Sequence, residues 1–336
     1  MDALSRFIEA MPKAELHVHL EGTLEPELKF ELAARNGIDL PYRSAAELRA
    51  TYAFDDLTSF LAVYYEGMSV LLTERDFYDL AIAYFRKAHS QNVVYAEVFL
   101  DPQAHTSRGV PFAAFMEGFR RAQEDAAAFG LHTRLIMCFL RDLTAESALQ
   151  TLEQSLPFKD WIVGVGLDSD ERDNPPVKFK DVFARARDEG YRLTMHCDVD
   201  QQDSVKHIWQ CVDEIGVERI DHGVNSLEDG ALVKEITGRG LGLTVCPISN
   251  GYVAGDLKAN EVKRMLDHGM RVTINSDDPA YFPGYMNENL NAVQAAARLS
   301  RDEIVQVARN AFTVGWLSEA ERSPYLEALE LYAGQR

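Results

Sequence analysis

Five residues of metal-binding type lie at the ends of short apolar runs along this chain. The first two, His17 and His19, are separated by a single residue. Alternate residues of a β-strand point to the same side, so this spacing aims both imidazoles at one point. The other three each end an apolar run of their own: His196, His222 and Asp277. Such a set predicts one convergent catalytic centre.

The donor types in this set indicate which metal would bind. Imidazole nitrogens with one carboxylate oxygen suit zinc or a similar divalent transition metal, whereas magnesium and calcium bind mostly oxygen. We therefore expect one Zn²⁺ per chain, held by His17, His19, His196 and Asp277. Zinc lowers the pKa of a bound water toward about 7, which makes a hydroxide nucleophile available at neutral pH. The four cysteines lack CxxC spacing, which argues against both a thiolate zinc module and a disulfide scaffold.

The strand and helix patterns predict an α/β fold that places these residues together. After a helical stretch between about residues 25 and 90, short apolar runs alternate with amphipathic helices every 30 to 40 residues, roughly. Eight strand candidates favour a (β/α)8 TIM-type barrel with extra helices after strand 1 and at the C-terminus. An open doubly wound sheet is the alternative, but its glycine-rich phosphate turn is replaced here by His-x-His. In a barrel, the active site lies at the C-terminal ends of the strands, where all five candidates fall.

Length and charge narrow the class of protein further. The 336 residues suit one barrel, so we expect a single domain over 1–336. The net charge of -19 disfavours nucleic acids and anionic membranes as partners and leaves small neutral substrates open. No apolar run reaches the roughly 20 residues that span a bilayer, and the N-terminus does not resemble a secretory signal, so a cytoplasmic location is expected. A homo-oligomer is compatible with the sequence.

Four motifs resemble those of the metal-dependent amidohydrolases and, within them, the adenosine and adenine deaminases. They are PKAELHVHLEGT at 12–23, RIDHG at 219–223, CPISN at 246–250 and NSDDP at 275–279, and the resemblance covers nearly the whole chain. It implies a barrel with one zinc and hydrolytic removal of the amine at C6 of a purine, giving a 6-oxopurine and ammonia or an amine. It also assigns the metal to the four ligands above, orientation of the water and stabilisation of charge to His222, and a hydrogen bond to purine N7 to Asp278.

Other residues bear on which purine is bound. Nucleoside deaminases of the family usually carry Asp after His-x-His-Leu and an Arg-Tyr-Ser-Pro-like segment after the second strand. This chain instead has Glu21 and FLDPQ at 99–103, which resemble the adenine deaminase branch. Bulky residues around Tyr281 would also fill the space that a ribose needs. We therefore expect a free base as substrate, with contacts from Glu21, Gln103, Ser169 and Asp278.

The main departure from the family pattern follows the fifth strand. The pattern there is His-Ala-Gly-Glu, in which Glu donates a proton to N1, but this chain has Val199 in place of the Glu. If the backbone stays extended, Asp198 and Asp200 point to the same side as His196, so either could be the proton donor. A shorter carboxylate beside the leaving amine would leave room for a substituent. We therefore hypothesise that N6-substituted adenines, such as isopentenyl or benzyl cytokinin bases, are preferred, with plain adenine as the competing substrate.

Three alternative functions are weighed against this one. The first is an adenosine deaminase that acts on the nucleoside. The second is an amidohydrolase acting on another ring or a phosphoester, but no lysine that could bridge two metals is evident near Ser169 after the fourth strand. The third is a purine-binding protein without activity, suggested by Val199 and opposed by retention of every predicted ligand. The zinc signature of cytidine deaminases does not occur.

Overall fold

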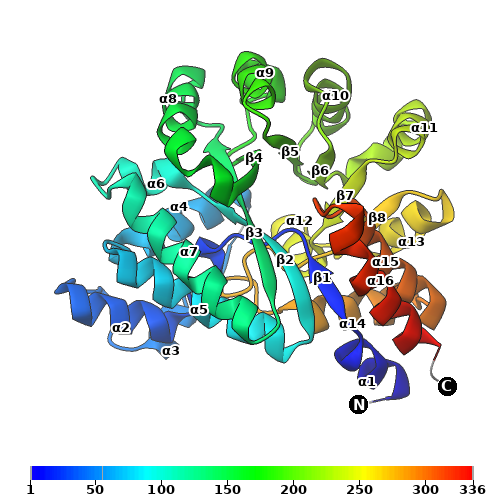
Figure 1. Cartoon of the computed structure of the whole chain (residues 1–336), viewed down its shortest axis with the longest axis horizontal. Coiled ribbons are helices and arrows are strands. Elements are labelled where there is room, and N and C mark those ends of the chain that lie inside the picture. Colours follow the sequence, from blue (N-terminus) through cyan, green and yellow to red (C-terminus); the bar gives the residue numbers. More distant parts are fainter. Residues whose placement is uncertain (1, 55, 335–336) are drawn as a thin grey trace.

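Eight parallel strands form one sheet that curls into a barrel in the computed structural model, which describes residues 2–54 and 56–334 (Figure 1). Each strand pairs with the next one in the chain. The strands are β1 (Lys13–Glu15), β2 (Val93–Leu100), β3 (His132–Leu140), β4 (Ile162–Asp168), β5 (Arg192–Cys197), β6 (Arg219–His222), β7 (Gly242–Val245) and β8 (Arg271–Ile274). This order confirms the predicted (β/α)8 TIM-type barrel.

Beyond the ends of β8 and β1, backbone hydrogen bonds join the last strand segment to the first. The His19 amide donates to the Asp277 carbonyl at 3.0 Å, and the Asp277 amide donates to the His17 carbonyl at 3.1 Å. β1 itself covers three residues, so His17 and His19 lie just past it and are held by isolated bridges of Val18 to Asp277 and of His19 to Phe99. The bonds that close the barrel are therefore made by the candidate metal ligands themselves.

Helices surround the sheet on the outside (Figure 1). The extra helices predicted after strand 1 are confirmed as α2 (Pro26–Asn36), α3 (Ala45–Arg49), α4 (Leu57–Gly67) and α5 (Glu74–Ser90). Those predicted at the C-terminus are confirmed as α15 (Arg301–Val314) and α16 (Glu319–Ala333), and α15 packs against β8 and β1. The remaining helices are α1 (Ala3–Ala10), α6 (Pro102–Thr106), α7 (Phe112–Ala128), α8 (Ala145–Ser155), α9 (Lys180–Asp188), α10 (Ser204–Trp209), α11 (Gly230–Arg239), α12 (Pro247–Ala254), α13 (Ala259–Asp267) and α14 (Met286–Ala297).

The strands are covered on both faces, which explains their continuous apolar runs. Glu97 is an exception within β2, and it is fully buried. Its carboxylate accepts hydrogen bonds from Arg219 at 2.5 Å, from the Tyr95 hydroxyl at 2.6 Å and from the Trp316 amide. A buried charge is tolerated when it is paired and hydrogen-bonded in this way.

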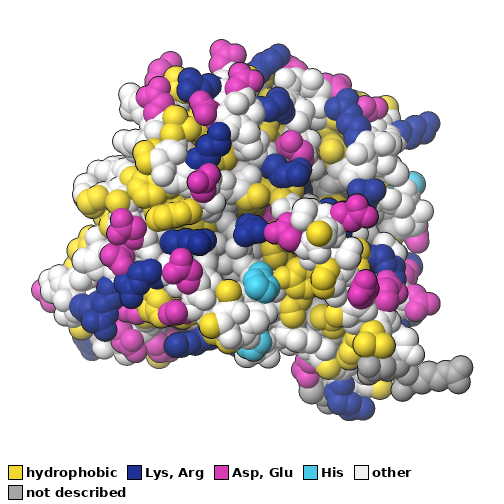
Figure 2. Space-filling view, in the orientation of Figure 1, with side chains coloured by type: hydrophobic (Ala, Val, Ile, Leu, Met, Phe, Trp, Pro, Cys, Tyr) yellow, Lys and Arg dark blue, Asp and Glu magenta, His cyan; other side chains and the backbone are white. Residues whose placement is uncertain are grey.

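The outer surface carries charges of both signs. Figure 2 shows acidic and basic side chains interspersed over the face in view. Among the helices of the described residues, none is long and apolar enough to cross a membrane.

Candidate active site

The four predicted metal ligands converge at the C-terminal ends of the strands. Their donor atoms all lie within 4.8 Å of one another, and all four residues are buried. His19 Nε2 lies 3.1 Å from His196 Nε2, and His17 Nε2 lies 3.0 Å from Asp277 Oδ1. His17 Nε2 nevertheless makes no hydrogen bond within the described structure. Nitrogen lone pairs and a carboxylate turned toward one point, with a buried nitrogen left without a partner, fit a divalent metal ion.

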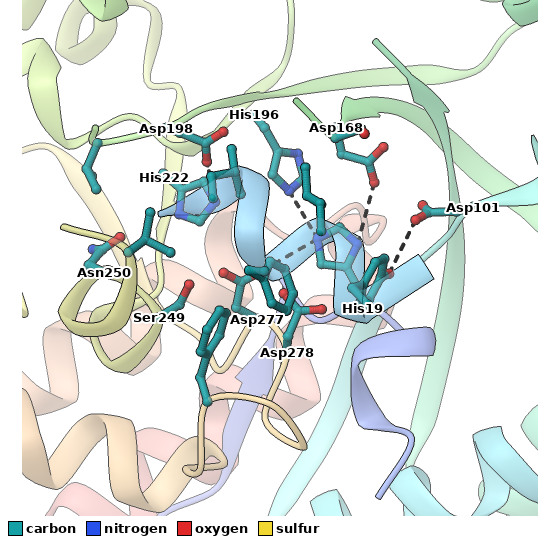
Figure 3. A pocket seen from close by; sticks show the side chains of 18 of the residues that line it. His19, Asp101, Asp168, His196, Asp198, His222, Ser249, Asn250, Asp277 and Asp278 are labelled. Carbon is teal, nitrogen blue, oxygen red and sulfur yellow. Dashed lines mark hydrogen bonds and ion pairs between the residues drawn. The ribbon is translucent and has the colours of Figure 1, made fainter. Parts of the chain in front are cut away.

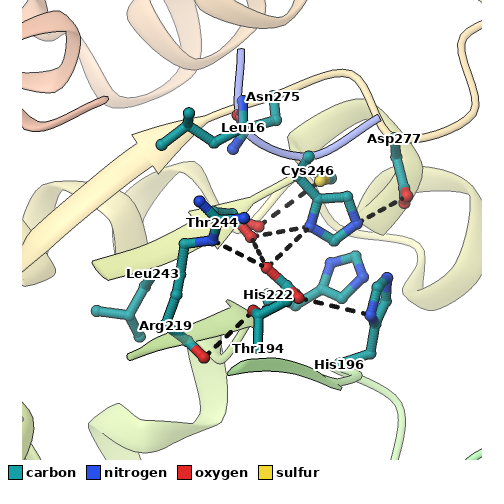
Figure 4. Close-up of polar contacts among 12 residues, drawn as sticks. Leu16, Thr194, His196, Arg219, His222, Leu243, Thr244, Cys246, Asn275 and Asp277 are labelled. Atoms are coloured by element: carbon teal, nitrogen blue, oxygen red, sulfur yellow. Dashed lines mark hydrogen bonds and ion pairs between the residues drawn. The ribbon is translucent and has the colours of Figure 1, made fainter. Parts of the chain in front are cut away.

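Hydrogen bonds around His17 fix its tautomer, with the proton on Nδ1 and the lone pair on Nε2. Thr244 Oγ1 donates to Asp221 Oδ1 at 2.8 Å, so it accepts from His17 Nδ1, which is also 2.8 Å away (Figure 4). The Nε2 of His17 therefore carries a lone pair for the metal. The other oxygen of Asp221 accepts from the Thr194 hydroxyl at 2.6 Å and lies 3.7 Å from His196 Nδ1. One buried carboxylate thus supports two ligands.

A second set of donors shares two of these ligands but replaces the others with His222 and Cys246. Burial raises the pKa of the Cys246 thiol well above its usual value. Its sulfur also lies 3.7 Å from the Thr244 carbonyl, to which the thiol donates. Because a metal ligand must be a thiolate, we favour the set with three histidines and one aspartate.

Three residues of the site have backbone φ angles in the left-handed region. The φ angles are 73° at Ser169, 57° at His222 and 68° at Asp277. Such angles are unfavourable for residues other than glycine and cost of order 1–3 kcal/mol each. Each of these residues follows or ends a strand, and each lines the cavity. At or just beyond the strand ends, unfavourable backbone angles therefore coincide with residues that line the cavity.

Asp198 lies beside His222 at the predicted proton-transfer end of the site. Its Oδ1 is 3.2 Å from His222 Nε2, and both residues line the cavity. Burial, and then the negative charge of Glu171, raises the pKa of Asp198 well above its usual value. Burial, and then neighbouring His17, lowers the pKa of His222 to about 4. A carboxyl group of raised pKa beside an imidazole of lowered pKa is a pair suited to donate and relay a proton.

The structure separates the two aspartates that the sequence left as alternatives. β5 ends at Cys197, and the chain turns at residues 199 and 200, so the extended backbone that the alternation assumed does not continue to Asp200. Asp200 is not among the described residues that line the cavity, and its carboxylate accepts from Gln201 Nε2 at 2.8 Å. Val199 does line the cavity, and its carbonyl accepts from Asn225 Nδ2 at 3.1 Å. The geometry therefore favours Asp198.

Sequence reasoning missed a buried residue that holds Asp198. Glu171 is fully buried, and its Oε2 accepts from the Asp198 amide at 2.8 Å. Its Oε1 lies 2.5 Å from His207 Nδ1, and Oε2 lies 3.5 Å from Arg141 Nη1, which also donates to the His196 carbonyl at 2.8 Å. The segment around Glu171 is acidic and polar, so nothing in its pattern distinguished this residue from solvated neighbours.

The residues predicted to contact the purine fall into two groups. Asp278 and Ser169 line the cavity, and neither Asp278 Oδ1 nor Ser169 Oγ has a hydrogen-bond partner in the described part of the chain. Glu21 is fully buried behind the wall, where burial raises its pKa to about 7 and its Oε1 lies 2.8 Å from His105 Nε2. The structure does not bring Gln103 to the cavity, because its amide bridges the Leu140 amide and the Ser147 hydroxyl.

The cavity above these residues measures about 560 Å³ including its open mouth. Figure 3 shows its carboxylates around His19 and His222. The described residues of its wall include no lysine or arginine. Its polar side includes five carboxyl groups, those of Asp101, Asp168, Asp198, Asp277 and Asp278, together with histidine, serine, asparagine and tyrosine side chains. Its apolar side consists of Leu57, Phe60, Leu61, Val199, Val253 and Phe282.

Comparisons with known proteins agree with this geometry. The family model described as adenosine deaminase matches residues 12–331. An adenine deaminase of Acinetobacter baylyi is 48% identical over 97% of this chain and 98% of its own. The crystal structure of an adenine deaminase from Arthrobacter aurescens superposes with a TM-score of 0.93 at 41% identity and covers 97% of this chain and 100% of its own. An amidohydrolase from Burkholderia ambifaria with bound zinc gives a TM-score of 0.88 at 25% identity, over 99% and 94% of the two chains.

Proposed function

The chain belongs to the adenosine deaminase family and is a hydrolytic deaminase of 6-aminopurines, and from this premise we propose that it uses one zinc ion to deaminate free purine bases. The observation that carries the proposal is the position of Asp198 and Asp278 in one cavity with three histidines and Asp277. The zinc bound in the amidohydrolase of similar structure supports the choice of metal.

His17, His19, His196 and Asp277 would hold the ion, and a bound ion would supply an activated water for attack at C6. The protein's own groups then move the protons. Asp198 delivers a proton to N1 as the ring loses its aromatic character, and a carboxyl of raised pKa is suited to that step. His222, 3.2 Å from Asp198, orients the water and stabilises the developing charge. Asp278, whose Oδ1 is otherwise without a partner, forms a hydrogen bond with N7.

The charge of the cavity supports a base rather than a nucleotide as substrate. Five carboxyl groups line the wall, and its described residues offer no lysine or arginine to pair with a phosphate. The apolar side chains of Phe60 and Phe282 offer a surface for a flat aromatic ring.

The expected preference for N6-substituted adenines is part of the proposal. Val199 and Val253 line the same cavity as Asp198, and an alkyl or aryl group on the leaving nitrogen would contact apolar side chains of this kind. The direct test compares kcat/KM for adenine and N6-isopentenyladenine. A value for adenine at least tenfold above that for N6-isopentenyladenine would refute the preference and leave plain adenine as the substrate.

A screen of the zinc-loaded protein tests the wider proposal. The panel contains adenine, adenosine, AMP and N6-alkyl and N6-aryl adenines, followed by loss of purine absorbance, with metal analysis of the same sample. We expect turnover of free bases, none of AMP, and one zinc per chain. Faster turnover of adenosine than of any base would favour the nucleoside deaminase. Binding of purines without turnover of any of them would favour the non-catalytic purine-binding protein.

A further inference from the structure

An ion pair crosses the interior of the barrel and takes no part in the proposed reaction. Arg219 of β6 and Glu97 of β2 are both fully buried, and Arg219 Nη1 donates to Glu97 Oε2 at 2.5 Å. The Arg219 guanidinium also stacks on the Trp316 ring, 4.4 Å from its centroid. The interior of such a barrel is filled mostly by branched apolar side chains. A buried ion pair is often no more stabilising than apolar side chains of similar volume, so stability alone does not account for this pair.

Arg219 faces the carboxylate that supports two of the metal ligands. Arg219 and Asp221 are two residues apart on β6, so their side chains point to the same side of the strand. Arg219 Nε lies 3.6 Å from Asp221 Oδ1, and Asp221 is fully buried. The same oxygen accepts from the Thr244 hydroxyl, which accepts in turn from His17 Nδ1. Figure 4 shows Arg219 at the opposite end of this network from Asp277.

The guanidinium group of Arg219 lies between two carboxylates. Its Nε and Nη2, both buried, make no hydrogen bond within the described residues. The contact between Nε and Asp221 is therefore an ion pair at 3.6 Å, in an interior where charges interact more strongly than in water. The group is thus hydrogen-bonded to Glu97 on one side and attracted to Asp221 on the other.

We propose that Arg219 is a positioning residue for the metal site. Its guanidinium, held in place by Glu97, fixes the Asp221 carboxylate. That carboxylate in turn orients the two histidines that it supports, His17 and His196. This inference rests on the proposed function, because it assumes a metal ion on these histidines. Residues that orient metal-binding histidines typically contribute about tenfold to a hundredfold to metal affinity or activity.

A purely structural role for the ion pair is the rival, and it gives different results. Removal of a pair that only fills the barrel interior would change the free energy of unfolding and leave the zinc affinity of the folded protein as it was. Removal of a group that acts through Asp221 changes the zinc affinity itself. That change should disappear in a protein in which Asp221 no longer has its carboxylate.

The experiment measures the zinc Kd of the metal-free protein by competition with a chelator, and the free energy of unfolding in urea. Arg219→Met alone would leave the Glu97 carboxylate buried without its partner, which is strongly destabilising. The test variant therefore combines Glu97→Gln with Arg219→Met, and its reference is Glu97→Gln, which lacks the same carboxylate but keeps Arg219. Arg192→Met is the control, because Arg192 begins the neighbouring strand β5 and is exposed.

We expect zinc to bind at least about tenfold more weakly in the double variant than in Glu97→Gln. With Asp221→Asn added to both proteins, the two should differ by less than about threefold. Arg219→Lys keeps the charge but replaces the planar group with a single nitrogen, and it should bind zinc at least about threefold more weakly than the parent. The KM for adenine of the loaded proteins should change less than kcat, since Arg219 is not among the described residues that line the cavity.

Contrary results are specific. Equal zinc Kd in the double variant and in Glu97→Gln overturns the inference and leaves a structural role. An equal loss with and without the Asp221 carboxylate also overturns it, because Arg219 would then act by another route. If the double variant does not fold, Arg219→Lys decides, and a zinc Kd like that of the parent overturns the inference.

Failure of the proposed function gives a different pattern. A parent protein that binds no zinc would overturn both the proposed metal and this inference. A parent that binds zinc with the expected dependence on Arg219, but deaminates no 6-aminopurine, would refute the proposed function and support this inference.

Discussion

Replacement of Glu171 by glutamine should lower kcat more than it changes KM. The Glu171 carboxylate holds the Asp198 amide at 2.8 Å and His207 Nδ1 at 2.5 Å, and it faces Arg141 at 3.5 Å. A glutamine side chain has one oxygen that can accept from these donors. Its NH2 group would face the remaining donors and could not accept from them. A lost hydrogen bond to a charged buried group costs about 1.5–3 kcal/mol, and a misplacement of about 1 Å at a catalytic group can cost a hundredfold in rate. We therefore expect a loss of about 2–3 kcal/mol in the free energy of unfolding and a tenfold to hundredfold lower kcat.

The assay is steady-state kinetics with zinc analysis and urea unfolding of each variant. Glu117→Gln is the matched control, since Glu117 is exposed on α7. His207→Asn keeps an N–H donor near the position of Nδ1 and should retain more kcat than His207→Leu. An unchanged kcat in Glu171→Gln would refute the reasoning. A kcat loss that parallels loss of zinc would also refute it, because the effect would then act through the metal.

The stability effect of this variant should depend on pH. Burial alone would raise the pKa of Glu171, but Arg141 and the hydrogen bond from His207 lower it below its usual 4.5. A carboxyl whose pKa is lower in the folded state stabilises the fold above the unfolded pKa and loses that contribution as the pH falls through the folded pKa. The difference in unfolding free energy between the parent and Glu171→Gln should therefore be full above about pH 5 and shrink below about pH 4. A difference that stays constant down to pH 3 would contradict this assignment.

Two further predictions concern the neighbouring residues. Asp198→Asn should lower kcat by at least about a hundredfold, as expected for loss of a general acid, while Asp200→Asn should stay within about threefold of the parent; similar kcat values in both variants would remove the proton-donor assignment. Gly22→Ala should lower kcat/KM for adenine by about tenfold or more, because a Cβ there would lie 2.0 Å from Asp278 Oδ1 and 2.9 Å from its Cα, and parent-like kinetics would show that Asp278 can move without penalty.

The sequence by itself determined which residues form the candidate metal site. His17 and His19 are related by the two-residue repeat of an extended backbone, and His196 and Asp277 each come at or just after the end of an apolar run. In a barrel of parallel strands, all such ends meet at one rim, so position along the chain was sufficient to bring them together. The barrel itself followed from the same runs, because its eight strands are local in sequence and covered on both faces.

Only the tertiary structure decided what surrounds the metal ligands. The choice of Asp198 over Asp200 depends on where the backbone leaves β5, and a repeat that holds within a strand says nothing about the loop after it. The Glu171 carboxylate is buried between segments that are far apart in sequence. Asp101 and Asp168 line one cavity, although Asp101 follows β2 and Asp168 ends β4, which are not adjacent strands. Contacts of this kind depend on the curvature of the closed sheet and on the packing of its loops, and no local pattern of residues records them.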